Sequence, residues 1–231
     1  LLKNDGILPI DGKRIFLVGP NASDTLMPLG NYNGTPLHTS TIEEGLNQCF
    51  AIAETVTDAD MIVYAGGLNP QLEGEELPID IPGFHKGDRT RIELPENQVE
   101  EIRQLKKLGK PLVLLLCTGS AIALENIINE TNAIMVCWYG GEDMGKAVAS
   151  ALAGESDNFG RLPVTFYKST SQLPDFDDYN MQGHTYKYMK QKPLFPFGYG
   201  LSYSDFKIEK ISVDYREMRV TGTVSNIGSK A

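Results

Sequence analysis

The sequence contains few of the residues that build disulfide frameworks and metal sites. Its 231 residues include three cysteines and three histidines. The cysteines, Cys49, Cys117 and Cys137, are far apart and mostly lie within apolar runs, so we expect buried thiols without disulfide or zinc-ligand spacing. The histidines also lack ligand spacing, and the sequence has no G-x-S-x-G nucleophile elbow and no phosphate-binding loop. The sequence therefore predicts neither a metal site nor a cofactor.

An excess of positive charge and long apolar runs are also missing. The net charge of -9 disfavours binding to a phosphate backbone, so we expect no nucleic-acid partner. No apolar run approaches the roughly 20 residues that span a bilayer, so we expect no membrane insertion. The opening "LLKNDGILPI" has neither an initiator Met nor the features of a signal peptide. We therefore expect the chain to come from a longer protein.

The apolar residues that are present form a regular alternation of strand and helix patterns. Continuous apolar runs predict buried strands within 13–20, 58–67, 111–119 and 133–141. Helical spacing predicts helices within 40–50, 94–111 and 142–154, the first with a capping box at Ser40 and Glu43. Strands that are apolar on both faces and separated by helices indicate a largely parallel sheet covered on both sides. The predicted fold class is α/β.

The character of the sequence changes near residue 204. The segments "FKIEKISV" and "RVTGTVSN" alternate polar and apolar residues, as half-exposed strands do. Two strands are too few to close a β-sandwich. We expect the last segment to be the start of a second, all-β unit.

Three carboxylates stand out in the stretch "GLNPQLEGEELPIDIPGFHKGDR", residues 67–89. Glu73, Glu75 and Glu76 directly follow a predicted strand, and ligands bind α/β sheets beyond the carboxyl ends of their strands. The loop from 68 to 95 is also longer than an ordinary connection, which favours a functional role. Cleavage of a glycosidic bond requires a carboxylic acid for the leaving oxygen and a second carboxylate on the other face of the sugar. A solvated surface loop is the alternative interpretation.

Four phrases carry a family resemblance. The phrases "GLNPQLEGEE…GDRTRIELPENQ", "GKPLVLLLCTGSAIAL", "AIMVCWYGGEDMGKAVASALAGESDNFGRLPVTF" and "LFPFGYGLSYSDF" together resemble the C-terminal α/β-sandwich domain of glycoside hydrolase family 3, especially its β-xylosidase-like members. The resemblance implies a six-stranded sheet between helices over 1–203, with 1–12 as a strap from a (β/α)8 barrel. It also implies that 204–231 begins a fibronectin type III-like domain.

The resemblance also implies a retaining mechanism that is divided between domains. The family's Asp nucleophile lies on the barrel, and no stretch of this sequence resembles the motif that carries it. The general acid/base Glu lies on a loop of the sandwich domain, and Glu75 matches its position best. The inserted "LPIDIPGFHKG" loosens this match, so Glu73 and Glu76 remain alternatives. This chain would then supply half of the catalytic pair.

Further residues match loops that approach the sugar in this family. They are Asn31, Tyr32 and Asn33 of "GNYNGTP". Independently of the resemblance, Asp88 and Arg89 close the loop of the three glutamates and can orient a carboxylate or bind hydroxyl groups, because Arg is always charged and has a rigid donor fork. The resemblance implies a β-linked xylo- or gluco-oligosaccharide as substrate, a role in xylan degradation, and the barrel of the same parent protein as partner. It slightly favours a periplasmic or extracellular location. A noncatalytic carbohydrate-binding or packing module is the alternative function, because a fold does not by itself imply chemistry.

Overall fold

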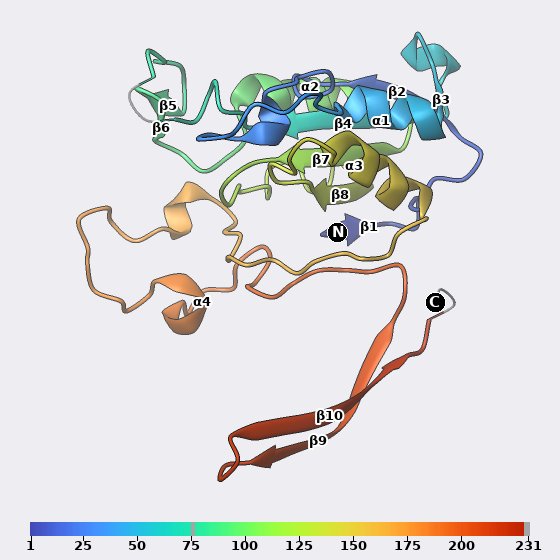
Figure 1. Cartoon of the computed structure of the whole chain (residues 1–231). Helices are drawn as coiled ribbons and strands as arrows, with labels where there is room; N and C mark the ends of the chain where they lie inside the picture. Colours follow the sequence, from blue (N-terminus) through green and yellow to red (C-terminus); the bar gives the residue numbers. More distant parts are fainter. Residues whose placement is uncertain (75–76, 229–231) are drawn as a thin grey trace.

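The computed structural model describes residues 1–74 and 77–228, and its centre is a six-stranded sheet (Figure 1). The order of the strands across this sheet is β1-β8-β7-β4-β2-β3. Its strands are β1 (Lys3–Asn4), β2 (Arg14–Val18), β3 (Ala51–Ile52), β4 (Met61–Gly67), β7 (Leu112–Cys117) and β8 (Ala133–Val136). The α-helices are α1 (Ile42–Cys49), α2 (Glu96–Lys106), α3 (Met144–Ala153) and α4 (Thr185–Tyr188). Three 3-10 helices, Met27–Leu29, Val56–Asp58 and Thr170–Gln172, lie in the connections.

The sheet is mixed. Strands β3, β2, β4, β7 and β8 pair in parallel with their neighbours, whereas β1 pairs antiparallel with β8. The predicted buried strands correspond to β2, β4, β7 and β8, and the predicted helices to α1, α2 and α3. The α/β class is therefore confirmed. The short strands β1 and β3 were not predicted, because two-residue strands carry no readable periodicity.

Two separate apolar cores lie on the two faces of the sheet. Successive residues of β4 alternate between them: Val63 belongs to the core under α1 and α3, and Tyr64 to the core under α2. Helices α1 and α3 contribute Leu46 and Val148 to the first core, and α2 contributes Ile102 to the second. All seven residues of β4 and all six of β7 are buried. This double burial explains why both strands read as continuous apolar runs in the sequence.

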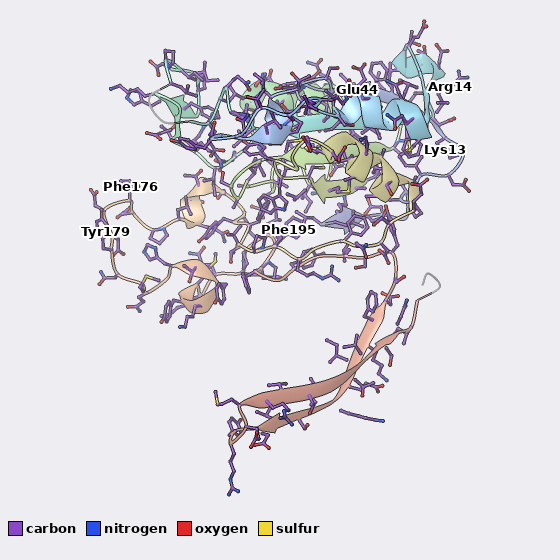
Figure 2. All side chains as sticks on the ribbon, in the orientation of Figure 1. Lys13, Arg14, Glu44, Phe176, Tyr179 and Phe195 are labelled. Carbon is purple, nitrogen blue, oxygen red and sulfur yellow. The ribbon has the colours of Figure 1, made fainter. Side chains whose placement is uncertain are left out.

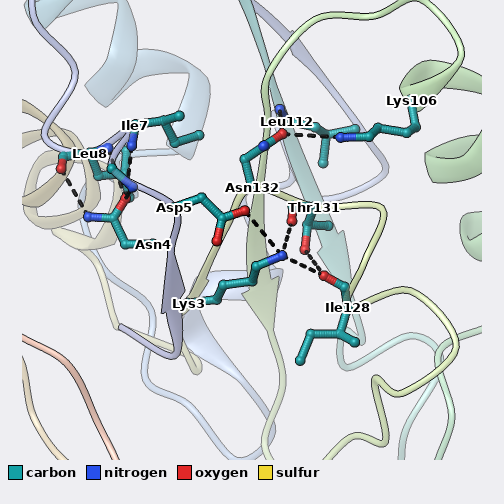
Figure 3. A network of polar contacts seen from close by, with 11 residues as sticks. Lys3, Asn4, Asp5, Ile7, Leu8, Lys106, Leu112, Ile128, Thr131 and Asn132 are labelled. Carbon is teal, nitrogen blue, oxygen red and sulfur yellow. Dashed lines mark hydrogen bonds and ion pairs between the residues drawn. The ribbon is translucent and has the colours of Figure 1, made fainter.

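Polar contacts fix the edge strand β1 beside β8 (Figure 3). The Lys3 ammonium donates to the carbonyl oxygens of Ile128, at 2.8 Å, and Thr131, at 2.5 Å, and lies 3.3 Å from the Asp5 carboxylate. The Asn132 side-chain oxygen accepts the backbone N–H of Leu112 at 3.1 Å. The segment before the first parallel strand is thus tied to the turn that precedes β8.

Two local predictions need correction. The capping box of α1 is formed by Thr41 and Glu44, one residue later than the predicted pair of Ser40 and Glu43. Both pairs fit the motif, but the carbonyl of Ser40 accepts the N–H of Gly145, so Ser40 stands before the helix. The thiols also differ from the expectation, because Cys49 is exposed at the last turn of α1 whereas Cys117 is buried.

The C-terminal segment is a two-stranded hairpin that extends away from the α/β body (Figure 1). Strands β9 (Phe206–Asp214) and β10 (Arg219–Asn226) pair antiparallel, which confirms the two strands predicted there. Both strands are almost wholly exposed, including the apolar Ile208, Val213 and Val220. Figure 2 shows two further exposed aromatic residues, Phe176 and Tyr179, on the loop that leads to α4. Within the described part of the chain, no helix is both long and apolar enough to span a bilayer.

Glycines allow α1 and α3 to approach each other closely. A Cβ atom on Gly145 of α3 would lie 1.8 Å from the carbonyl oxygen of Thr41, and one on Gly45 of α1 would lie 2.0 Å from that of Gly145. Real Cβ atoms do not come so close to backbone oxygens. The two helices therefore pack backbone against backbone at this contact.

We predict that Gly145→Ala lowers the free energy of unfolding by about 3 kcal/mol, because the added methyl group forces the two helices apart. Urea denaturation of the purified chain measures this change. The matched control is Gly160→Ala, since a Cβ at Gly160 meets no atom within 4 Å, and we expect it to stay within about 0.5 kcal/mol of the wild type. Equal denaturation midpoints for the two variants would contradict the prediction.

A buried glutamine fixes the end of β4. The side-chain amide of Gln98 on α2 donates to the carbonyl of Gly67 and accepts the N–H of Gly67, each at 2.8 Å. Gly67 has a φ of 111°, and a Cβ there would lie 2.0 Å from the carbonyl oxygen of Cys117. Glycine is therefore required at this position, and Gln98 replaces the hydrogen bonds that its backbone would otherwise lack.

Replacing Gln98 with Ala should destabilise the chain by about 2 to 4 kcal/mol, because two buried backbone groups of Gly67 lose their partners. Thermal and urea unfolding both report this loss. Gln104→Ala, an exposed position on the same helix, controls for the change in helix propensity. A Gln98→Ala variant as stable as Gln104→Ala would show that water satisfies both groups.

Candidate functional site

The candidate site forms where β4 and β7 end side by side. Gly67 and Cys117, the last residues of the two strands, are register partners, and the N–H of Leu68 donates to the carbonyl of Cys117 at 2.8 Å. The long loop 68–95 and the segment that begins at Thr118 therefore leave the sheet from the same edge. This edge is the carboxyl end of the parallel strands, where α/β proteins place ligands.

The loop 68–95 is organised by turns and by a small hairpin of its own. After β4, the carbonyl of Asn69 accepts the N–H groups of Leu72 and Glu73, both at 3.0 Å. Strands β5 (Phe84–His85) and β6 (Asp88–Arg89) then pair through a two-residue turn whose residues, Lys86 and Gly87, have φ values of 51° and 84°. Two positive φ values are typical of the turn that suits a tight hairpin.

Glu73 lies at the centre of the site. Its Oε1 atom accepts a hydrogen bond from the Ser120 hydroxyl at 3.0 Å and lies 3.9 Å from Nη1 of Arg89. The side chain is 25% exposed, so it is held on one side and open to solvent on the other. Among the described residues, no hydrogen bond to its second oxygen, Oε2, is found. One carboxylate oxygen is thus fixed and the other is available.

Arg89 holds this arrangement in place from its buried side. Its side chain is only 9% exposed, and Nη1 donates to the Ser120 hydroxyl at 2.9 Å and to the carbonyl of Ala121 at 3.0 Å. Burial lowers the pKa of Arg89 from its usual value, while the nearby Glu73 carboxylate opposes that change. Its Nε and Nη2 atoms are buried without a hydrogen-bond partner in the described structure. The cost of this burial is offset by the charge of Glu73 and the contacts through Nη1.

A pocket of about 390 Å³ opens beside these residues. It is lined by Asn31, Tyr32, Pro70, Glu73, Gly74, Leu77, Gly87, Asp88 and Arg89. The segment that carries Asn31 contacts the loop 68–95, which we call the carboxylate loop. The Asn31 side-chain amide donates to the carbonyl of Glu73 at 2.9 Å. Tyr32 stands out from this loop with 95% of its surface exposed and a φ of 56°. A strained, exposed aromatic residue at a pocket is a candidate ligand contact.

The structure brings together five of the eight predicted site residues. Asn31, Tyr32, Glu73, Asp88 and Arg89 line the pocket. Asn33 is not among the lining residues, and its side-chain amide donates to the neighbouring carbonyl of Gly34 at 2.7 Å. Glu75, the predicted acid/base, and its alternative Glu76 lie outside the described residues.

Two residues of the site were missed by the sequence reasoning. Ser120 bonds both Glu73 and Arg89, and Tyr139 packs against Gly30 and Gly119. Burial, together with the Glu73 carboxylate nearby, raises the pKa of Tyr139. For Ser120 the available signal was the small polar run "TGS" directly after the strand 112–117, at the sheet edge where ligands bind.

The chemistry of the site is that of hydrogen bonding and proton transfer. A carboxylate, a guanidinium and a side-chain amide converge on a pocket with an exposed aromatic ring, and such groups suit a polyhydroxylated ligand. A carboxyl group with one free oxygen can also exchange a proton with a bound ligand. The described residues include no group of three or more His, Cys, Asp or Glu placed to hold a metal ion.

Comparison with known sequences identifies the family. The model described as "Glycosyl hydrolase family 3 C-terminal domain" matches residues 1–203. A xylan 1,4-beta-xylosidase of Xylanibacter ruminicola is 46% identical over 173 residues, which cover 73% of this chain and 20% of that protein. A probable exo-1,4-beta-xylosidase of Neosartorya fischeri is 33% identical over 238 residues, covering 90% of this chain and 29% of that protein. The chain thus spans a fifth to about a third of the length of these relatives.

Solved structures support the same assignment. A GH3 exo-beta-xylosidase in complex with a xylobiose aziridine probe has a TM-score of 0.78 and 27% identity, covering 91% of this chain and 30% of its own. A beta-glucosidase of Listeria innocua in complex with glucose has a TM-score of 0.79 and 26% identity, covering 99% of this chain and 36% of its own. With the sheet topology and the family match over 1–203, these likenesses show that the chain belongs to glycosyl hydrolase family 3 and contains its C-terminal domain.

Proposed function

We propose that this chain is the C-terminal part of a retaining, exo-acting β-glycosidase of the β-xylosidase type. It supplies the general acid/base glutamate, and the Asp nucleophile comes from a barrel domain of the same parent protein. The observation that carries the proposal is the pocket that joins Glu73, Asp88 and Arg89 to Asn31 at the carboxyl edge of the sheet. The xylosidases among the relatives support a β-xyloside as substrate, and the glucosidase structure supports a β-glucoside.

The acid/base belongs to the segment that contains Glu73, Glu75 and Glu76. The family pattern favours Glu75. Glu73 is the one candidate among the described residues, and there it lines the pocket with Oε1 bonded to Ser120. In a retaining mechanism this residue first protonates the leaving oxygen and then takes a proton from the attacking water. All three residues are therefore candidates that mutation can separate.

The neighbouring polar residues bind the sugar in this proposal. Asn31 and Asp88 hydrogen-bond hydroxyl groups, and the exposed ring of Tyr32 packs against a sugar face. Arg89 holds the carboxylate loop and adds positive charge next to the glycosidic oxygen. Asn33 contacts substrate only if its side chain turns away from Gly34.

The domain division is also a proposal. Residues 1–203 form the α/β-sandwich domain, with 1–12 as the strap from the barrel, and 204–231 begin a fibronectin type III-like domain. Strands β9 and β10 support this division, because their apolar residues face solvent and need the further strands of a β-sandwich to cover them.

The isolated 231-residue chain should not hydrolyse aryl β-xylosides, because the step that forms the glycosyl-enzyme needs the nucleophile of the barrel. Release of nitrophenol from an aryl β-xyloside measures this activity, with the parent protein as positive control. Turnover that persists through purification and disappears on Glu75→Ala or Glu73→Ala would contradict the division of the catalytic pair.

Ala substitutions at Glu73, Glu75 and Glu76 in the parent protein identify the acid/base. The variant that lacks the acid/base should hydrolyse xylobiose about 10²- to 10⁴-fold more slowly than the wild type. Its hydrolysis of an activated aryl xyloside should fall far less, because only the poor leaving group needs a proton. Azide needs no general base, so it should restore turnover of that variant with the aryl xyloside and yield a β-glycosyl azide.

The other two Ala variants serve as matched controls in the same assays, because each removes a carboxylate from the same loop. Product analysis by mass spectrometry distinguishes a glycosyl azide from the hydrolysis product. If none of the three variants is rescued, these carboxylates do not supply the acid/base, and the loop binds sugar or is only solvated.

A further inference from the structure

A chain of two hydrogen bonds links Arg89 to Glu73 through a hydroxyl group that the sequence reasoning did not select. The Ser120 Oγ atom lies 2.9 Å from Nη1 of Arg89 and 3.0 Å from Oε1 of Glu73. The three side chains come from β6, from the segment after β7, and from the loop after β4. Ser120 is the shared partner of the two charged groups.

The direction of both hydrogen bonds follows from counting protons. A guanidinium has five donors and no acceptor, so the Ser120 oxygen accepts from Arg89. Serine has a single hydroxyl hydrogen, which is therefore free to point at Oε1 of Glu73. Oε1 is then occupied as an acceptor, and a proton on the Glu73 carboxyl group belongs on Oε2, the oxygen for which the described residues provide no partner.

Ser120 is itself held rigidly. Its N–H donates to the hydroxyl of Thr118 at 3.1 Å, and that hydroxyl donates to the carbonyl of Ser120 at 2.8 Å. Thr118 is buried directly after β7, so this small turn is fixed to the sheet. Arg89 is fixed in turn by the carbonyl of Ala121, the residue after Ser120. Ser120, which lies outside the loop 68–95, is therefore a fixed hydrogen-bond partner for Glu73.

From this geometry we propose that Ser120 is a positioning residue for the acid/base. It donates to Oε1 of Glu73 and thereby presents Oε2 as the atom that gives the proton to the leaving oxygen and later removes one from water. This inference rests on the proposed function and takes Glu73 as the acid/base among the three candidates. Rigid placement of this kind is what a general acid requires, because proton transfer needs hydrogen-bond distance to the reacting oxygen.

The test uses the parent protein and the variants Ser120→Ala and Ser120→Thr. Loss of a hydrogen bond to a charged group should lower kcat/KM for xylobiose about 10-fold or more in Ser120→Ala, with little change in kcat/KM for an activated aryl xyloside, because kcat/KM reports the step in which the leaving group departs. Ser120→Thr keeps the hydroxyl and should recover most of the activity. The control is Ser23→Ala, which removes a similar bond between a serine hydroxyl and a carboxylate, to Glu43 at 2.6 Å on the surface, and should leave both rates unchanged.

The pH profile separates positioning from a merely structural effect. The basic limb of kcat/KM reports loss of the donor's proton in the free enzyme. Removal of the hydroxyl that donates to this carboxyl group should displace the limb in Ser120→Ala, and Ser120→Thr should return it to its original place. If Ser120 has only a structural role, Ser120→Ala should slow the hydrolysis of both substrates alike and leave the basic limb where it is. This result would overturn the inference.

A second variant tests the inference even if Ser120→Ala does not fold. Glu73→Gln keeps the shape and the Ser120 contact but has no transferable carboxyl proton, so it should lose xylobiose turnover, lose the basic limb, and respond to azide. The same behaviour in Glu75→Gln instead would overturn the assignment to Glu73 and leave the proposed function intact. A wild-type parent protein that hydrolyses neither β-xylosides nor β-glucosides would overturn the proposed function itself.

Discussion

The parallel pairing of β4 with β7 is the constraint on which the candidate site depends. Its register ends with Gly67 opposite Cys117, so two segments that are far apart in the sequence leave the sheet at the same point. A shift of one residue would turn every side chain of β4 to the opposite face and move Leu68 away from the carbonyl of Cys117. Both strands are buried on both faces, which makes such a shift costly. The meeting of Glu73 and Ser120 follows from this register.

Close backbone approach is the second condition, and it explains several residues that have no chemistry of their own. Gly67 permits the loop to leave β4 directly over Cys117, and Gln98 supplies the hydrogen bonds of its peptide groups. On the other face, Gly45 and Gly145 bring α1 against α3. Side chains larger than hydrogen at these points would separate layers that the two cores hold together. The positions of the residues at the sheet edge therefore depend on the close packing of the layers.

The arrangement of side chains at the sheet edge depends on electrostatic interactions. Arg89 is a permanent cation that is nine-tenths buried, which is costly unless a carboxylate and good hydrogen-bond acceptors are near. Glu73, Ser120 and the carbonyl of Ala121 provide these. Since the same carboxylate faces a pocket, the group that stabilises the cation is also the group that can meet a ligand. Structural and chemical requirements coincide on one side chain.

The sequence by itself determined the buried strands, the main helices and the α/β class, because hydrophobic periodicity is a local property of the chain. It also located the carboxylate loop, since Glu73, Asp88 and Arg89 directly follow or close a long connection after an apolar run. It placed the cap of α1 one residue early, because Ser40 and Thr41 both satisfy the same short motif and only the contact of Ser40 with α3 distinguishes them.

Only the tertiary structure decided which of the polar residues meet. Ser120 and Glu73 are 47 residues apart, and no local pattern specifies a contact at that separation. The burial of Arg89, the exclusion of Asn33 from the pocket and the antiparallel β1 depend likewise on strand order and register. These features arise from the packing of distant segments, whereas a sequence pattern reports on the side chains of one element at a time.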